Sequence, residues 1–334
     1  MAKIAVLGAG WGTALAVMAS RDHAHEVCLW SPFQQEIDEI RRHGEHRRLL
    51  PGVPVPPSIT LTTELSCVSQ AEAVILATPS FAVRETAKKM APLLQAGTLV
   101  INVSKGFEET TFLTFSQVLS EELPEARVVT LTGPSHAEEV GRGVPTSVVC
   151  ASKDVEAAEL AQELLMSERF RIYVTDDVIG AELGGALKNV IALAAGICDG
   201  LAVGDNTKAA LMTRGLAEIA RLGTAMGART ETFAGLSGMG DLIVTCGSMH
   251  SRNRRCGMAI GRGKTAREAV AEVGTVEGYY AAASAFALAQ KTGVEMPITE
   301  QCYRVCYEDK NPIQALKDLM RRPMRHEAET LWMK

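Results

Sequence analysis

Apolar and polar positions follow different patterns in the two halves of the chain. In the first half, short β-branched apolar runs are separated by segments in which apolar residues recur at helical spacing. The runs expected to be strands are residues 3–7, 26–30, 73–77, 98–103, 127–131, 146–150 and 170–174. Strands that alternate with helices indicate βαβ units, and therefore an α/β domain with a mostly parallel, doubly wound sheet.

From Asp177 onward the strand pattern disappears. Ala, Leu, Met, Glu and Arg dominate, glycines interrupt the apolar runs, and this half is expected to be mostly helical. A chain of 334 residues is also long for a single hydrophobic core. We therefore predict an α/β domain of residues 1–176 followed by an all-α domain of residues 177–334. The proline-rich stretch 51–57 is expected to be a loop inside the first domain.

Composition restricts the class of partner. The net charge of −5 provides no basic field, so neither nucleic acid nor an acidic membrane surface is expected. The eight cysteines are scattered, and the closest pair, Cys302 and Cys306, has no second pair at zinc spacing, so no metal is predicted. Reduced thiols and a start without a signal-peptide pattern favour the cytoplasm. The longest apolar stretch, residues 190–202, is interrupted by Asp199 and is expected to be too short to span a bilayer.

A glycine-rich turn follows the first expected strand. Gly8, Gly10 and Gly12 lie where a helix should begin, which is where a dinucleotide pyrophosphate rests on backbone amides. The usual spacing is G-x-G-x-x-G, and here the third glycine arrives one residue early. A tight structural turn would use the same residues. The position after the first strand, together with the strand–helix alternation, favours nucleotide binding.

The end of the second expected strand bears on the choice of cofactor. A carboxylate there would bind the ribose hydroxyls of NAD, but the strand ends Trp-Ser-Pro-Phe, with Ser31 in the position of interest. Because no carboxylate opposes a 2′-phosphate and Ser31 can donate a hydrogen bond to one, we expect NADP(H) to be favoured over NAD(H). Use of both cofactors stays open.

A single lysine, Lys188, lies inside an apolar run of small residues at 185–192. Burial removes the water that stabilises an ammonium group, so the pKa of such a lysine falls toward the range where it exchanges a proton. Lys188 is therefore a candidate general acid or base. Beside a nicotinamide cofactor, such a lysine indicates hydride transfer to a carbonyl.

Other polar clusters also follow apolar runs. Lys105 comes after an expected strand, Ser251 begins an expected helix, and Arg252 next to it suits a phosphate monoester. Asp241, in a glycine-rich segment, is placed to hold a lysine ammonium or to accept from a substrate hydroxyl. Ser135 offers a hydroxyl after another strand. Each has a plainer interpretation: an exposed turn lysine, a basic turn, a turn aspartate and a helix cap.

Together these motifs resemble the bacterial NAD(P)-dependent glycerol-3-phosphate dehydrogenase family, from the first strand to about Tyr280. The motifs that carry the resemblance are residues 185–192, Asp199-Gly-Leu, 204–211, 213–218, Gly240-Asp-Leu and 251–255. The resemblance implies an N-terminal Rossmann domain and an all-helical C-terminal domain. It also implies reversible reduction of dihydroxyacetone phosphate to sn-glycerol 3-phosphate, which supplies the glycerol backbone of phospholipids.

The resemblance also implies roles for individual residues, with Lys188 as the catalytic general acid and base. Predicted substrate contacts are Lys105, Gly133, Ser135, Lys188, Asp241, Ser251, Arg252 and Asn253. Predicted cofactor contacts are Gly8, Gly10, Trp11, Gly12, Ser31, Lys105, Ala137, Arg252 and Glu277. The substrate is expected to be a small phosphorylated triose or glycerol, and the helical half is expected to form a homodimer.

Two departures from the family pattern stand out. The glycine turn lacks one residue that most members carry, and Ser31 stands where members often have a basic residue. Two alternatives therefore remain. One is a related two-domain dehydrogenase, such as a ketopantoate reductase or a β-hydroxyacid dehydrogenase, which lacks the cluster at 251–253. The other is a nucleotide-sensing protein without turnover.

Overall fold

The computed structural model describes residues 1–324, 326 and 327, and this part of the chain forms two compact units. The first unit comprises Met1–Ser104 and Leu113–Val178. The second comprises Lys105–Phe112 and the chain from Ile179 onward. Residues 325 and 328–334, which include the end of the predicted helical domain, lie outside the described residues.

An eight-stranded sheet forms the centre of the first unit, in the order β3-β2-β1-β4-β5-β6-β7-β8. All neighbouring strands are parallel except β6 and β7, so the predicted, mostly parallel sheet is confirmed. The strands are β1 (Lys3–Leu7), β2 (Glu26–Trp30), β3 (Thr60–Thr62), β4 (Ala73–Leu76), β5 (Leu99–Asn102), β6 (Arg127–Thr132), β7 (Thr146–Ala151) and β8 (Phe170–Thr175). Strand β3 was not predicted, because a three-residue strand is too short to show a period of two.

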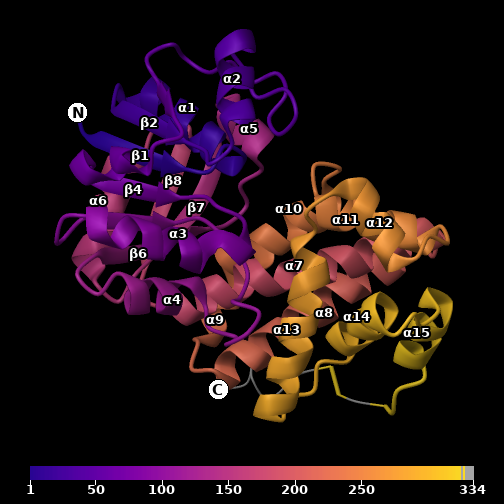
Figure 1. Ribbon diagram of the computed structural model, residues 1–334. Coiled ribbons are helices and arrows are strands. Elements are labelled where there is room, and N and C mark those ends of the chain that lie inside the picture. Colours follow the sequence, from indigo (N-terminus) through magenta and orange to yellow (C-terminus); the bar gives the residue numbers. More distant parts are fainter. Residues whose placement is uncertain (325, 328–334) are drawn as a thin grey trace. The chain divides into compact units, whose positions relative to one another are not determined.

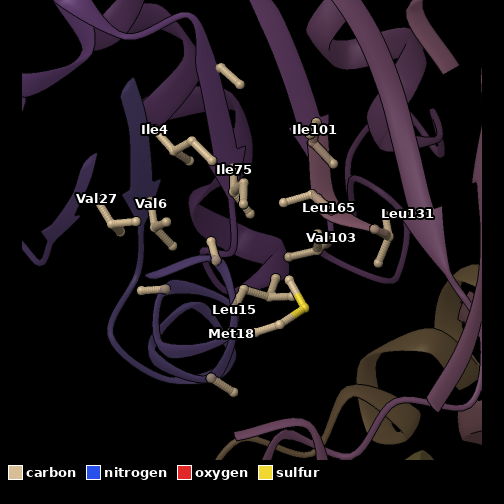
Figure 2. Close-up of a cluster of buried hydrophobic side chains, with 14 of the residues drawn as sticks. Ile4, Val6, Leu15, Met18, Val27, Ile75, Ile101, Val103, Leu131 and Leu165 are labelled. Carbon is tan, nitrogen blue, oxygen red and sulfur yellow. The ribbon is translucent and has the colours of Figure 1, made fainter. Parts of the chain in front are cut away.

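Helices cover both faces of this sheet (Figure 1). They are α1 (Trp11–His23), α2 (Gln34–His43), α3 (Val83–Met90), α4 (Phe115–Glu122), α5 (Ala137–Gly141) and α6 (Val155–Leu165). Alternate residues of a strand point to opposite faces, so Val6 packs in one hydrophobic cluster while Leu7 packs in another. Figure 2 shows Leu15 and Met18 of α1 among the strand side chains of the first cluster. Burial of both faces explains the continuous apolar runs.

The second unit consists of helices around a separate core (Figure 1). Its elements are α7 (Val178–Leu201), α8 (Asp205–Ala225), α9 (Thr230–Ala234), a π-helical turn η4 (Leu236–Gly240), α10 (Asp241–Gly247), α11 (Arg252–Gly261), α12 (Ala266–Val273), α13 (Glu277–Thr292), α14 (Pro297–Tyr307) and α15 (Pro312–Met320). Phe107 and Phe112, from the segment after β5, pack in this core. The predicted helical half is confirmed.

The apolar stretch within α7 is longer than the sequence analysis supposed. The helix has 24 residues and contains an 18-residue window of mean hydropathy 1.4, so by length and composition it could span a bilayer. However, 94% of that window is buried inside the protein. The helix is therefore a core helix, and its apolar character reflects burial on every side.

Helices α7 and α11 cross at four glycines. Gly196 and Gly200 of α7 meet Gly257 and Gly261 of α11, each pair spaced by four positions. A Cβ on Gly196 would lie 2.1 Å from the carbonyl oxygen of Arg254, and one on Gly257 would lie 2.0 Å from that of Leu193. The backbones are thus in direct contact, as small residues at i and i+4 permit. This crossing fixes the start of α11 against the helix that carries Lys188.

Candidate active site

Three predicted site residues of the second unit meet at one buried carboxylate. Asp241 is 1% exposed, and its Oδ2 accepts a hydrogen bond of 2.7 Å from Lys105 Nζ. Its Oδ1 accepts from Lys188 Nζ, which also donates to the hydroxyl of Thr245 at 2.7 Å. Thr245 in turn donates to the backbone carbonyl of Asp241. Two ammonium groups are therefore held by one carboxylate, and the ammonium of Lys188 makes two hydrogen bonds out of the three that it can donate.

Burial and charge set the protonation of this cluster. Burial lowers the pKa of Lys188 to about 7; Asp241 opposes this shift, and the neighbouring Lys105 adds to it. Burial alone would raise the pKa of Asp241, but the two lysines outweigh it and hold that pKa below its usual value. Asp241 is consequently ionised near neutral pH, while Lys188 is poised between its charged and neutral forms. This is the balance that general acid–base catalysis requires.

Local backbone geometry brings Asp241 to Lys188. Gly184 lies four residues before Lys188 and therefore on the same face of α7. A Cβ on Gly184 would lie 2.4 Å from the carbonyl oxygen of Ser237, so the turn η4 packs directly on the helix at this glycine. Because η4 ends at Gly240, the next residue, Asp241, begins α10 beside the following turn of α7. Asp241 is thus not a simple turn aspartate, which was the plainer interpretation.

A second hydrogen-bonded cluster holds the start of α11. Asn253 Nδ2 donates to Asn189 Oδ1 at 2.8 Å, and the backbone N–H of Gly278 donates to Asn253 Oδ1 at 2.8 Å. These bonds link the neighbours of three predicted site residues, because Asn189 follows Lys188, Asn253 follows Arg252, and Gly278 follows Glu277. Asn189 belongs to the motif at residues 185–192, but nothing in the sequence predicted that its side chain pairs with that of Asn253.

The first turn of α11 has the features of an anion site. Ser251 caps the helix by accepting from the backbone N–H of Arg254 at 3.2 Å, as expected. Arg252 is exposed, and its guanidinium has no hydrogen bond or ion pair with any described part of the chain. Arg254 does not fit the plainer interpretation of this segment as a solvated basic turn, since it donates to Asp199 at 2.6 Å. Asp199 also binds Lys208, so Arg254 belongs to a structural ion-pair network.

The glycine turn of the first unit fits a dinucleotide pyrophosphate. Gly8 has φ +117°, and a Cβ there would lie 2.5 Å from the carbonyl oxygen of Ala77. Gly12 supplies the close contact of α1 with the sheet, because its Cβ would lie 3.0 Å from Val6 Cγ1. Helix α1 begins at Trp11 and has no side-chain cap and no acid in its first turn. Its terminal amides therefore remain suited to an anion although the turn is one residue short.

The structure contradicts the argument made for Ser31. This residue is fully buried, and its hydroxyl donates to Glu36 Oε2 at 2.6 Å. It is therefore not a free donor for a 2′-phosphate. The premise that no carboxylate lies near the end of β2 was also wrong, because Glu36, five residues further on in α2, reaches back to it. A pattern confined to the last strand residue could not reveal that carboxylate.

The remaining predicted contacts lie at two helix starts. Gly133 follows β6 with φ +131°, and a Cβ there would lie 3.1 Å from Val148 Cα. Ser135 donates to the carbonyl of Gly133 and does not cap α5, whose N-cap is His136. Ala137 is the first residue of α5. In the second unit, Glu277 is the first residue of α13.

Neither a metal-binding cluster nor a disulfide is found among the described residues. Among residues 1–324, 326 and 327, no group of three or more His, Cys, Asp or Glu side chains is arranged to hold a metal ion. All eight cysteines are free thiols.

A cavity of about 580 Å³ in the second unit is lined by residues of α7, α8, α14 and α15. None of its lining residues is a predicted site residue.

Comparison with known proteins gives matches over nearly the whole chain. Residues 3–158 match the family described as NAD-dependent glycerol-3-phosphate dehydrogenase N-terminus, and residues 177–317 match the corresponding C-terminus. Two relatives, both named glycerol-3-phosphate dehydrogenase (NAD(P)+), come from Desulfitobacterium hafniense and Pelotomaculum thermopropionicum. They are 52% and 53% identical over 98% of this chain, and the matches cover 94% and 95% of the relatives.

A solved structure supports the same assignment. Glycerol-3-phosphate dehydrogenase from Coxiella burnetii has a TM-score of 0.92 to this chain at 40% sequence identity. The match covers 96% of this chain and 99% of the Coxiella chain. Sequence, domain order and fold agree along both units. The chain therefore belongs to the NAD-dependent glycerol-3-phosphate dehydrogenase family.

Proposed function

We propose that this chain catalyses the reversible, NAD(P)-dependent reduction of dihydroxyacetone phosphate to sn-glycerol 3-phosphate, a precursor of glycerophospholipids. The observation that carries the proposal is the pair of lysines, buried Lys188 and half-buried Lys105, on the buried carboxylate of Asp241. A carbonyl that accepts a hydride becomes an alkoxide, and two ammonium groups at one point stabilise and then protonate such an oxygen. The full-length relatives are named glycerol-3-phosphate dehydrogenase, which supports this choice of substrate.

The proposed division of labour follows the two predicted domains. Residues 1–176 bind the nicotinamide dinucleotide, whose reduced ring supplies the hydride when bound. Residues 177–334 supply the chemistry at the substrate. The turn from Gly8 to Gly12 with Trp11 holds the pyrophosphate on backbone amides. Further cofactor contacts are assigned to Lys105, Ala137, Arg252 and Glu277.

Each polar side chain then has a defined task. Lys188 gives its proton to the oxygen at C2, Lys105 polarises the same oxygen, and Asp241 orients both lysines. Arg252, Ser251 and the free N–H of Asn253 bind the phosphate, and Gly133 and Ser135 complete the substrate contacts. Binding the phosphate tightly at a distance from C2 converts that binding energy into orientation of the carbonyl.

The pKa of Lys188, lowered to about 7, predicts opposite pH dependences for the two directions. Ketone reduction requires protonated Lys188, so kcat/KM should fall as pH rises through about 7. Glycerol 3-phosphate oxidation requires neutral Lys188, so kcat/KM should rise over the same interval. Initial rates in both directions measure this. Titration of the substrate phosphate would change both directions alike, so profiles of the same sign would contradict the assignment.

The activity itself is tested by following the absorbance of NADH and NADPH in the presence of dihydroxyacetone phosphate. Dihydroxyacetone without the phosphate is the matched control and should react far more slowly. Equal rates with both ketones would favour a related two-domain dehydrogenase. Cofactor binding without turnover of any ketone would favour a nucleotide sensor.

We also propose a cytoplasmic homodimer. The free thiols are typical of a reducing compartment. Helix α15 exposes Ile313 and Met320, and its residues Ala315, Leu316 and Leu319 line the apolar cavity of the second unit. An apolar surface of this kind is typical of a subunit interface. Light scattering after size-exclusion chromatography should give twice the 35.8 kDa of one chain. A mass of 35.8 kDa at micromolar concentration would contradict the dimer.

A further inference from the structure

A carboxylate lies just beyond the end of β2 in the first unit. Glu36 Oε2 accepts a hydrogen bond of 2.6 Å from Ser31, the residue that follows the strand. In sheets of this class the adenosine ribose lies beyond the end of the second strand, where a carboxylate binds its hydroxyls and opposes a 2′-phosphate. Glu36 therefore brings to this place, from the first turn of α2, a group that the strand itself does not supply.

The surroundings identify this place as the ribose end of the cofactor site. The backbone N–H of Gly8, in the glycine turn, donates to the carbonyl of Trp30, the last residue of β2, at 2.9 Å. A Cβ on Gly10 would lie 3.8 Å from Leu49, so the loop after α2 borders the same turn. The glycine turn, the end of β2 and the loop after α2 are thus adjacent within the first unit. The carboxylate of Glu36 lies among them.

The carboxylate of Glu36 is more deeply buried than the cation that binds it. Glu36 binds Arg48, at 2.7 Å from Oε1, but the Arg48 side chain is 68% exposed whereas that of Glu36 is 12% exposed. Exposed charges are screened by solvent more strongly than buried ones. The charge of Arg48 is therefore screened more strongly by solvent than the charge of Glu36. A second carboxylate, Glu39, lies on the other side of the buried His46 ring. The Nδ1 atom of His46 lies 3.8 Å from Glu39, and its Nε2 atom lies 3.9 Å from Glu36.

Glu36 is ionised at neutral pH and retains acceptor capacity. Its contact with His46 and the hydrogen bond from Ser31 keep the pKa of Glu36 below its usual value, although burial opposes this. A carboxylate offers about four acceptor positions, and Ser31 and Arg48 occupy two of them. The other positions suit ribose hydroxyls. A phosphate dianion would meet a fixed negative charge.

We infer that Glu36 determines the cofactor preference of this chain, accepting hydrogen bonds from the ribose of NAD(H) and disfavouring the 2′-phosphate of NADP(H). The inference rests on the proposed function. It reverses the preference for NADP(H) expected from the sequence, because that expectation assumed no carboxylate near Ser31. Two other arginines of this region, Arg41 and Arg47, are paired with Asp38 and Glu45.

The test is direct binding of NADH and NADPH to the full chain without substrate, followed by nicotinamide fluorescence. Wild-type protein should bind NADH about tenfold more tightly than NADPH, as a fixed charge facing a phosphate dianion predicts. Glu36→Gln keeps an acceptor for Ser31 and removes the charge, so it should reduce that ratio by about fivefold or more, through tighter NADPH binding. Glu26→Gln, an exposed change at the opposite end of β2, should leave the ratio unchanged.

The outcomes separate this inference from the proposed function. NADPH binding as tight as NADH in wild-type protein would overturn the role of Glu36 without any variant and would leave the dehydrogenase activity intact. Weaker NADPH binding by Glu36→Gln would also overturn the role of Glu36. That result would indicate that Arg48 binds the 2′-phosphate and that Glu36 positions Arg48. Failure to bind either cofactor would overturn the proposed function and this inference together.

Discussion

Replacing Lys188 by alanine is expected to lower kcat for ketone reduction by about 10³-fold or more. The change removes the proton donor and one of the two cations at the developing alkoxide, and each of these effects is worth about 10²-fold or more. Steady-state rates with saturating dihydroxyacetone phosphate and NADH measure the loss. Asp241 keeps Lys105 as a partner, so the buried carboxylate is not left without a counterion.

Two further variants show whether the loss is chemical. Arg252→Ala removes a guanidinium from the first turn of α11 and should chiefly raise KM for the phosphorylated ketone. Lys291→Ala removes an exposed lysine near the end of α13 and should leave both constants unchanged. Binding of NADH should persist in the variants at Lys188 and Lys291. Equal and modest effects of the changes at Lys188 and Arg252 would show that the proposed roles are wrong.

Replacing Gly257 by alanine should destabilise the protein by about 3 kcal/mol or more. In an open helix this change is favourable by up to about 1 kcal/mol, because alanine has the higher helix propensity. Here the added Cβ would lie 2.0 Å from the carbonyl oxygen of Leu193 and 2.8 Å from the amide nitrogen of Ile197. Backbone atoms cannot rotate away, so α7 and α11 must separate, and overpacking of this kind costs more than the propensity gains.

The matched control for this prediction is Gly247→Ala, the same substitution at the end of α10. No atom lies within 4 Å of the Cβ position at Gly247, so its stability should change by less than about 0.5 kcal/mol. Urea unfolding followed by circular dichroism compares the two variants with wild type. If Gly257→Ala were as stable as Gly247→Ala, the direct backbone contact of α7 and α11 would not exist in solution.

Much of the fold was predictable from local pattern. Seven of the eight strands follow from β-branched runs between turn signals, and their alternation with helices indicates a mostly parallel sheet. The exception is β3, whose three residues show no measurable period. The apolar stretch of α7 is longer than the expected one at 190–202, and Asp199 does not end the helix. That carboxylate is instead paired with Lys208 and Arg254, so the helix continues past it.

The residue types of the candidate site were predictable from the sequence, but the contacts between those residues were not. Lys188 stood out because a lysine in an apolar helix is unusual, and Ser251 showed the signature of a helix cap. The bond between Asn189 and Asn253 had no such signal, nor did the pairing of Ser31 with Glu36. Side chains of this kind are common on surfaces, and only their burial against each other makes them part of a site.

The sequence by itself determined the two classes of architecture, the position of the glycine turn and the candidate lysines, because periodicity and motif spacing are local properties. Tertiary structure decided the rest. Asp241 lies 53 residues from Lys188 and 136 residues from Lys105, and no local preference relates them. Their meeting depends on glycines that let backbones touch, and the pKa of Lys188 depends on the burial and charges that this meeting creates. Electrostatic properties belong to the folded arrangement, since they depend on distance in space.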